Sequence, residues 1–76
     1  MNLQQRSRRV TEYSREWRTV DGAYAVRESS IPGYPVRYYA LVNTLKGWRS
    51  IEKREDRLPR TYKTKAKAVE VIAKQL

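Results

Sequence analysis

The sequence predicts an α+β domain in which a small antiparallel sheet packs against one C-terminal α-helix. Strand-like runs separated by turn residues fill the middle of the chain, and the last fifteen residues carry apolar side chains at helical spacing. A chain of 76 residues has the length of one domain. We expect a three-stranded sheet, with four strands as the alternative. Residues 1–18 are interpreted as a basic N-terminal arm, and residues 19–76 as a single sheet-plus-helix domain.

The arm allows several structures. Its few apolar and aromatic side chains fall near one face of a helix, whereas residues 10–13 and 17–20 are rich in strand-favouring types. The first eight or nine residues hold almost nothing apolar, so we expect them to be frayed or disordered. The arm is then either a solubilising tail or an accessory arm that follows phosphates. The accessory cations would be Arg6, Arg8 and Arg9.

Asp21 and Gly22 form the strongest short turn signal, because Asp-Gly supplies the positive φ values of a tight hairpin turn. They separate a short partner-strand candidate from residues 23–28. In this second run the side chains alternate, so Val26 and Arg27 are expected on opposite faces of a strand.

A second hairpin follows a loop at residues 29–35, where two prolines and a glycine favour a turn. Residues 36–42 are the most apolar strand candidate and are expected at the centre of the sheet. Residues 43–47 have the length of a hairpin turn, and residues 48–54 form the return strand. The charges on that strand are typical of a sheet edge.

The C-terminal helix is expected to begin after Thr64, whose hydroxyl can accept a free backbone N–H of the first turn. A helix this short needs an apolar surface, and one face of the sheet can provide it. The helix-free face is expected to expose Arg37, Tyr39, Leu41 and Trp48. The expected core consists of Tyr24, Val26, Val36, Tyr38, Ala40, Val42, Ile51, Val69, Ile72 and Leu76.

Composition argues against an enzyme. Without cysteine or histidine the chain lacks the usual nucleophile, the imidazole base and the two commonest zinc ligands. No Gly-rich phosphate loop is present, and the acidic residues at 52, 55 and 56 sit among cations as in a solvated loop. We therefore expect no catalytic residue, no cofactor, no metal and no small-molecule substrate. No apolar run suits a membrane span or a secretory signal, which favours a cytoplasmic protein.

Charge is the main functional signal. The chain has 17 Lys and Arg against 8 Asp and Glu, a net charge of +9 and a pI near 10.3. Such a field attracts polyanions, and nucleic acid is favoured, with duplex DNA ahead of RNA. Residues 46–67 are the densest basic stretch, which predicts one positive band over the return strand, the loop at residues 52–63 and the helix start. The predicted nucleic-acid-binding residues are Arg37, Tyr39, Trp48, Arg49, Lys53, Arg54, Arg57, Arg60, Lys63, Lys65 and Lys67.

Residues 62–68 read Tyr-Lys-Thr-Lys-Ala-Lys-Ala and lead into the helix. Together with the preceding strands, this segment resembles small three-stranded-sheet-plus-helix DNA-binding domains, namely the arm-binding domain of tyrosine recombinases and the AP2-type domain. The resemblance covers about residues 23–76 and implies a sheet that enters the major groove. It would place DNA contacts on Arg37, Tyr39, Trp48 and Arg49.

The same layout is also similar to a double-stranded-RNA-binding domain. That resemblance implies phosphate contacts from Lys63, Lys65 and Lys67 at the helix start. The Gly-rich approach to that helix is absent from this chain.

The alternative function is a small regulatory protein, of phage or host type, that binds an acidic protein. Tyr39, Leu41 and Trp48 would then form an aromatic and apolar hot spot within the basic face.

Overall fold

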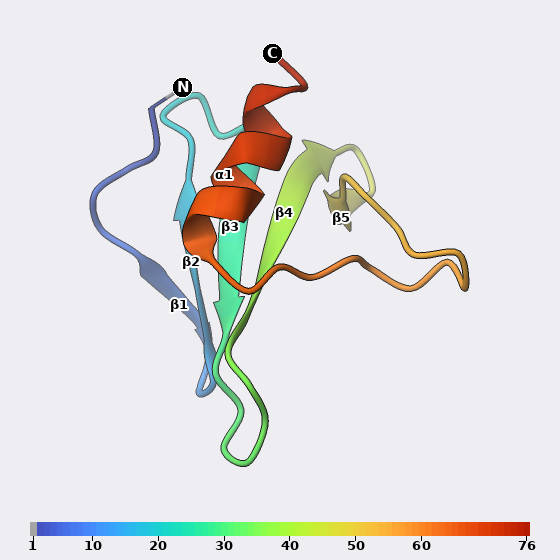
Figure 1. Ribbon diagram of the computed structural model, residues 1–76. Helices are drawn as coiled ribbons and strands as arrows, with labels where there is room; N and C mark the ends of the chain where they lie inside the picture. Colours follow the sequence, from blue (N-terminus) through green and yellow to red (C-terminus); the bar gives the residue numbers. More distant parts are fainter. Residues whose placement is uncertain (1) are drawn as a thin grey trace.

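A computed structural model describes residues 2–76 as an open antiparallel sheet with one helix packed on one face (Figure 1). The sheet has five strands in the order β1-β2-β3-β4-β5, so each strand pairs with its neighbours in sequence. The α+β class and the C-terminal helix are confirmed, and the sheet is larger than the three or four strands predicted. The elements are β1 Arg8–Thr11, β2 Ser14–Arg18, β3 Tyr24–Ser29, β4 Arg37–Thr44, β5 Gly47–Ser50 and α1 Lys65–Ala73.

The additional strands come from the N-terminal arm. Residues 8–18 form β1 and β2 and not a helix, and β2 pairs with β3 along its whole length. Residues 2–4 run beside the end of β2, with the Gln4 N–H donating to the Arg18 carbonyl at 2.9 Å. These segments satisfy backbone groups that an isolated edge strand would leave open, which explains their order despite few apolar side chains. The part of the predicted arm at Met1 lies outside the described residues.

A turn at Asp21 and Gly22 is confirmed, but it is longer than a two-residue hairpin turn, since β2 ends at Arg18 and β3 begins at Tyr24, and only the glycine has a positive φ. Gly22 has φ 74°, a left-handed conformation that favours glycine. The Thr19 hydroxyl donates to the Asp21 carboxylate at 2.6 Å, and the Thr19 N–H donates to the Tyr24 carbonyl at 2.8 Å. These bonds fix the register of β2 against β3, which sets the face on which every later side chain lies.

Helix α1 begins as predicted, because the Thr64 hydroxyl accepts the backbone N–H of Lys67 at 3.1 Å. It lies across β3 and β4 on one face of the sheet (Figure 1). The helix ends at Ala73, so Leu76 lies beyond it and is 70% exposed. The prediction that Leu76 belongs to the core is therefore wrong. Within residues 2–76 no helix combines the length and apolarity that crossing a bilayer requires.

The core lies between α1 and this face of the sheet. Of the predicted core residues, Val26, Ala40 and Ile72 are fully buried, whereas Val36 precedes β4 and is 43% exposed. The sequence did not identify Trp17, because it placed residues 1–18 outside the domain. The buried cluster is Trp17, Val26, Ala40, Tyr62, Ala68, Val71 and Ile72, and Leu3, Tyr24, Tyr38, Ile51 and Val69 pack against it.

The chain between β5 and α1 makes an excursion from the sheet, visible as the segment that swings outward past β5 in Figure 1. β5 ends at Ser50, earlier than the predicted return strand at residues 48–54. The chain rejoins the sheet at Tyr62, which exchanges two backbone hydrogen bonds with Tyr38 of β4, at 2.9 and 2.8 Å. Residues 52–60, called here the 52–60 loop, therefore stand at the border of the sheet.

Candidate nucleic-acid interface

The sheet face opposite α1 buries side chains although no helix covers it. Ala25 and Leu41 are partners in the β3–β4 register and are 0% and 5% exposed. Two long side chains from different strands, Arg18 of β2 and Trp48 of β5, cover them, and this pair is called here the roof. The Arg18 guanidinium lies 5.2 Å from the Trp48 ring centroid. This contact passes over the strands between them. Leu41, predicted to be exposed, is therefore buried.

A buried carboxylate anchors this roof. Glu16 of β2 is 1% exposed and accepts hydrogen bonds from Arg18 Nε at 2.8 Å and from Arg27 Nη2 at 2.8 Å. Burial alone would raise the pKa of Glu16, but the hydrogen bonds and charges of Arg27 and Arg18 outweigh it, and the pKa falls below its ordinary value. Glu16 therefore stays ionised at neutral pH and holds both guanidinium groups in fixed positions.

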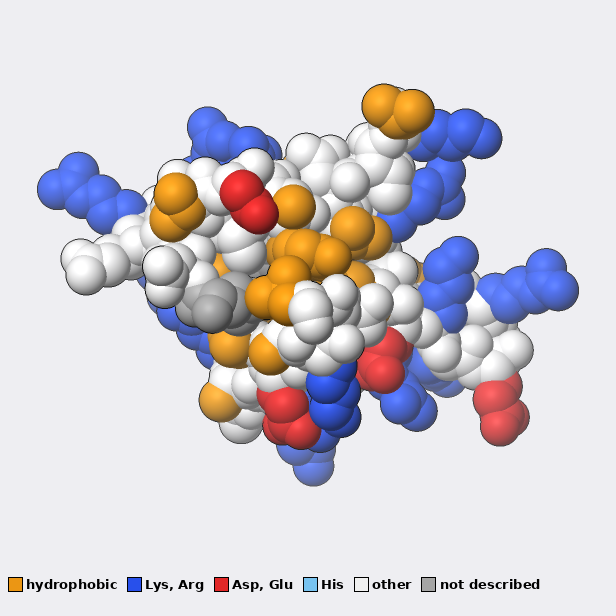
Figure 2. Space-filling model, turned by 90° about the horizontal axis from the view of Figure 1, so that it is seen from above, with side chains coloured by type: hydrophobic (Ala, Val, Ile, Leu, Met, Phe, Trp, Pro, Cys, Tyr) orange, Lys and Arg blue, Asp and Glu red, His pale blue; other side chains and the backbone are white. Residues whose placement is uncertain are grey.

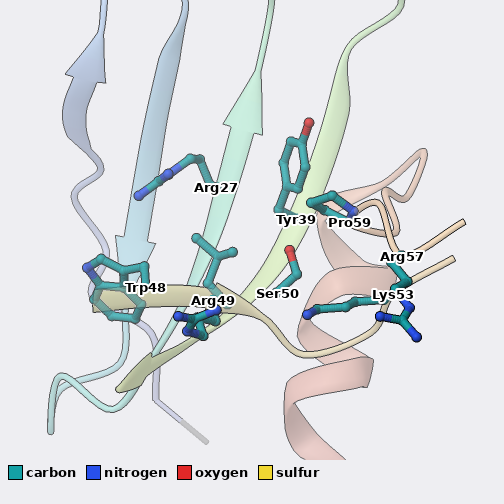
Figure 3. A pocket seen from close by; sticks show the side chains of 9 residues that line it. Arg27, Tyr39, Trp48, Arg49, Ser50, Lys53, Arg57 and Pro59 are labelled. Atoms are coloured by element: carbon teal, nitrogen blue, oxygen red, sulfur yellow. The ribbon is translucent and has the colours of Figure 1, made fainter. Parts of the chain in front are cut away.

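An open cleft of about 390 Å³ lies beside the roof on the same face (Figure 3). In Figure 3, Trp48 and Arg27 lie on one side of it, and Lys53 and Arg57 of the 52–60 loop lie on the other. Its lining combines four cations and two aromatic rings from three strands and the loop. The lining residues are Arg27, Tyr39, Leu41, Trp48, Arg49, Ser50, Lys53, Arg57 and Pro59.

The 52–60 loop is closed by its own hydrogen bonds. At its base, Glu52 accepts the Tyr62 hydroxyl on its carboxylate and the Arg60 N–H on its carbonyl. Nearer the tip, the Arg54 N–H donates to the Leu58 carbonyl at 2.8 Å. Burial, followed by the hydrogen bond to Glu52, raises the pKa of Tyr62, so its hydroxyl remains a donor throughout the ordinary pH range. The loop therefore presents its side chains from a fixed frame.

Arg57 occupies an unusual backbone position at the tip of this loop. Its φ is 67°, and its N–H donates to the Arg54 carbonyl at 2.9 Å. The left-handed region costs a non-glycine residue about 1 kcal/mol or more. It is the only non-glycine residue among positions 2–76 with a positive φ. A strained residue whose side chain lines a cleft is a candidate for function.

The ion pairs leave the cleft positive. Acidic side chains pair with cations elsewhere, for instance Glu28 with Arg15 and Glu70 with Lys74. Of the cleft cations, Arg27 is paired with Glu16. The described residues provide no ion-pair partner within 4.0 Å for Arg49, Lys53 or Arg57, the other three. Their charge is therefore available to an anion.

The structure brings together part of the predicted binding set. Five of its members line the cleft: Tyr39, Trp48, Arg49, Lys53 and Arg57. Arg37 projects from the same face, but its guanidinium donates to the Val36 carbonyl and does not line the cleft. Arg54 pairs with Asp56 at 3.1 Å, and Arg60 is exposed outside the cleft.

The helix-start lysines lie away from this site. Lys65 Nζ is 4.0 Å from the ring centroid of Trp17, which belongs to the core on the helix-covered face. Lys63 and Lys67 flank it, so the predicted single positive band is divided between the two faces. Lys67 also pairs with Glu70. The accessory cations Arg8 and Arg9 lie in β1, at the sheet edge opposite β5, and Arg6 precedes that strand.

Arg27 is the cleft cation absent from the predicted set. Alternation did place it on the face opposite Val26, but only the register shows that Arg27 lies opposite Tyr39 on one side and Glu16 on the other. Glu16 was hidden for a related reason, because the strand that carries it was assigned to the arm. The signal was present as an acidic residue between Arg15 and Arg18 on a strand-like run.

Figure 2 gives the wider distribution of charge. Seen from above, hydrophobic side chains gather at the centre of this end of the molecule, and Lys and Arg project from its rim.

No three Asp or Glu side chains among residues 2–76 form a group that could hold a metal ion.

Together, the fold and site define a small α+β domain with a basic, aromatic cleft on the helix-free face of its sheet. Searches against protein-family models, curated proteins and solved structures gave no match to this chain. The resemblance to recombinase arm-binding, AP2-type and double-stranded-RNA-binding domains therefore stays a prediction.

Proposed function

We propose that this protein binds nucleic acid without catalysing a reaction, and that the cleft is its principal contact. One observation supports this most strongly. Arg49, Lys53 and Arg57 come from β5 and the 52–60 loop, have no ion-pair partner within residues 2–76, and line one cleft with two aromatic rings. Cations bind phosphates, and aromatic rings stack on bases.

The overall charge acts in the same direction. A net charge of +9 on a chain with a radius of gyration of 11.8 Å gives a strong attractive field for a polyanion. Phosphates held by the cleft cations would release condensed counterions, which makes the affinity depend steeply on salt. Duplex DNA, which the sequence favours, would be held through its backbone along the border formed by β5 and the 52–60 loop.

The acidic-protein alternative has less support. Its hot spot included Leu41, which is 5% exposed and cannot serve as an anchor for a partner. Tyr39 and Trp48 remain partly exposed, but they are surrounded by cations and not by an apolar patch.

A salt series of binding to oligonucleotides tests the proposal. We expect micromolar dissociation constants at low salt and a linear fall of log affinity with log salt concentration. Lys53→Gln should reduce the slope by about one contact, whereas Lys74→Gln, which removes the same charge from the helix end, should change it far less. Absence of binding at low salt to duplex DNA, duplex RNA and single strands alike would refute the proposal.

A further inference from the structure

We infer that the cleft selects single-stranded nucleic acid, with one unpaired base in the cleft that Tyr39 and Trp48 line and the adjoining phosphates on Arg49, Lys53 and Arg57. This inference rests on the proposed function and names the form of nucleic acid that the site would take.

The width of the sheet argues against insertion into a duplex. Five strands spaced about 4.8 Å apart place the outer strands about 19 Å from each other, whereas the major groove is about 12 Å wide. The helix-free face as a whole therefore does not fit that groove. The 52–60 loop stands at one border of this face and makes it still wider there. A duplex lying across the face would keep its bases inside the stack, away from the cleft.

The aromatic rings suit an unpaired base. Tyr39 and Trp48 are partly exposed and come from the adjacent strands β4 and β5. Trp17 shows the contrast, because it is buried and has two cations near its ring, Arg15 and Lys65, at 5.1 and 4.0 Å from the centroid. The Trp48 ring has Arg18 at 5.2 Å from its centroid but is partly exposed. A sheet face that carries exposed aromatics beside cations is the common platform for stacked bases of single strands.

The platform is held in place before any ligand arrives. Glu16 fixes Arg18 at 2.8 Å, and the Arg18 guanidinium lies against the Trp48 ring. The same carboxylate fixes Arg27, which lines the cleft. A side chain that is already ordered loses less conformational entropy on binding, so this arrangement favours affinity.

The size of the cleft limits what it can accept. A volume of about 390 Å³ is near the lower end of the roughly 300–1,000 Å³ typical of small-ligand clefts, which suits one nucleotide unit. The unpaired cations come from β5 and the 52–60 loop, so the backbone of the strand would run along these two segments with its base turned inward. Three such contacts on a single strand give a salt slope of about −2.

Binding measurements on the intact chain test this inference. The ligands are a short oligo(dT), a short oligo(rU) and a duplex DNA with the same number of phosphates, each over a range of salt. We expect the single strands to bind at least about tenfold more tightly than the duplex. The comparison of oligo(dT) with oligo(rU) tells whether the sugar contributes.

Variants then separate stacking from charge. Trp48→Leu should weaken single-strand binding by about tenfold with little change in salt slope, because stacking on an aromatic ring is worth about 1–3 kcal/mol per base. Tyr39→Leu provides an independent test if the first variant does not fold. Tyr34→Leu is the matched control, since Tyr34 is 73% exposed in the loop before β4 and does not line the cleft. It should change the affinity less than twofold.

The outcomes of this inference and of the proposed function are distinguishable. Equal binding of duplex and single strand, or unchanged single-strand affinity in folded Trp48→Leu and Tyr39→Leu, would overturn the inference and leave phosphate binding standing. If the intact chain bound none of these ligands at low salt, both this inference and the proposed function would be overturned.

Discussion

The two faces of the sheet solve the same burial problem in different ways. On the helix-covered face, apolar side chains such as Val26 and Ala40 are buried by α1, through Ile72. On the other face, Ala25 and Leu41 are buried by a roof of Arg18 and Trp48. The first arrangement uses a whole helix to cover the apolar side chains. The second needs only long side chains that an ionised carboxylate holds in place.

The difference indicates that one face of the sheet serves mainly stability and the other mainly binding. The helix-covered face is packed against α1, and Lys65 Nζ lies 4.0 Å from the Trp17 ring centroid. The helix-free face is open beside its roof, and there the unpaired cations of β5 and the 52–60 loop gather. Substitutions on the first face should therefore act on the free energy of unfolding, and substitutions around the cleft should act on affinity.

The largest effect is expected at the centre of the helix-covered face. Ile72 is fully buried, so Ile72→Ala should lower the free energy of unfolding by about 3 kcal/mol through lost burial and a cavity. Leu76→Ala removes a similar side chain that is 70% exposed and should cost less than about 0.5 kcal/mol. Urea unfolding followed by circular dichroism measures both. Equal losses would mean that α1 does not pack as described.

Next in size is the carboxylate under the roof. Glu16→Gln leaves Arg18 and Arg27 without their charged partner and should lower the free energy of unfolding by about 2 kcal/mol. It should also weaken single-strand binding severalfold, because Trp48 loses its support. Glu12→Gln, at an exposed position, is the control and should change neither quantity appreciably. A Glu16→Gln protein as stable as the parent would show that the roof does not depend on this ion pair.

A smaller effect is expected on acidification. The folded-state pKa of Glu16 lies below its ordinary value of 4.5, so its stabilisation is complete above that value and is lost as pH falls through the folded-state pKa. Unfolding experiments between pH 7 and pH 3 should thus show a stability decline that is shallower in Glu16→Gln. Parallel pH profiles for the two proteins would assign the decline to other carboxylates.

The smallest stability effect, with an opposite sign, concerns Arg57. Arg57→Gly relieves a left-handed backbone at φ 67° and should leave the protein as stable as before or more stable by up to about 1 kcal/mol. The same substitution should weaken nucleic-acid binding severalfold and reduce the magnitude of the single-strand salt slope by about 0.7. Arg57→Lys keeps the charge and should retain the slope. A glycine variant with parental affinity would show that Arg57 does not contact phosphate.

How far the sequence predicts this molecule depends on whether a feature is local. The Thr64 cap, the Asp21-Gly22 turn and the strand character of residues around Val26 and Ala40 are set by neighbours in sequence, and all are confirmed. For β1 the sequence left strand, helix and tail open, because this strand is exposed along its length and owes its structure to pairing with β2, which no hydrophobic period reveals.

The site was predictable only in part for the same reason. Tyr39 and Trp48 follow from alternation within one hairpin, whereas Arg49 comes directly after Trp48, so alternation alone would place it on the other face. Arg27 and Glu16 depend on register across strands, and a shift of one residue would have reversed their faces. The division between the cleft and the lysines at the helix start depends on the path of the 52–60 loop, which hydrogen bonds between distant residues define.

The two tryptophans offer the most direct test of the account, because one lies on each face. A ¹H–¹⁵N spectrum of the uniformly labelled protein resolves both indole N–H groups during titration with a short oligo(dT). Binding in the cleft predicts a large, saturable shift of the Trp48 indole and little change at Trp17, whose ring is already covered by cations from β2 and α1. A larger shift at Trp17 than at Trp48, or equal shifts of both, would contradict the assignment of binding to the helix-free face.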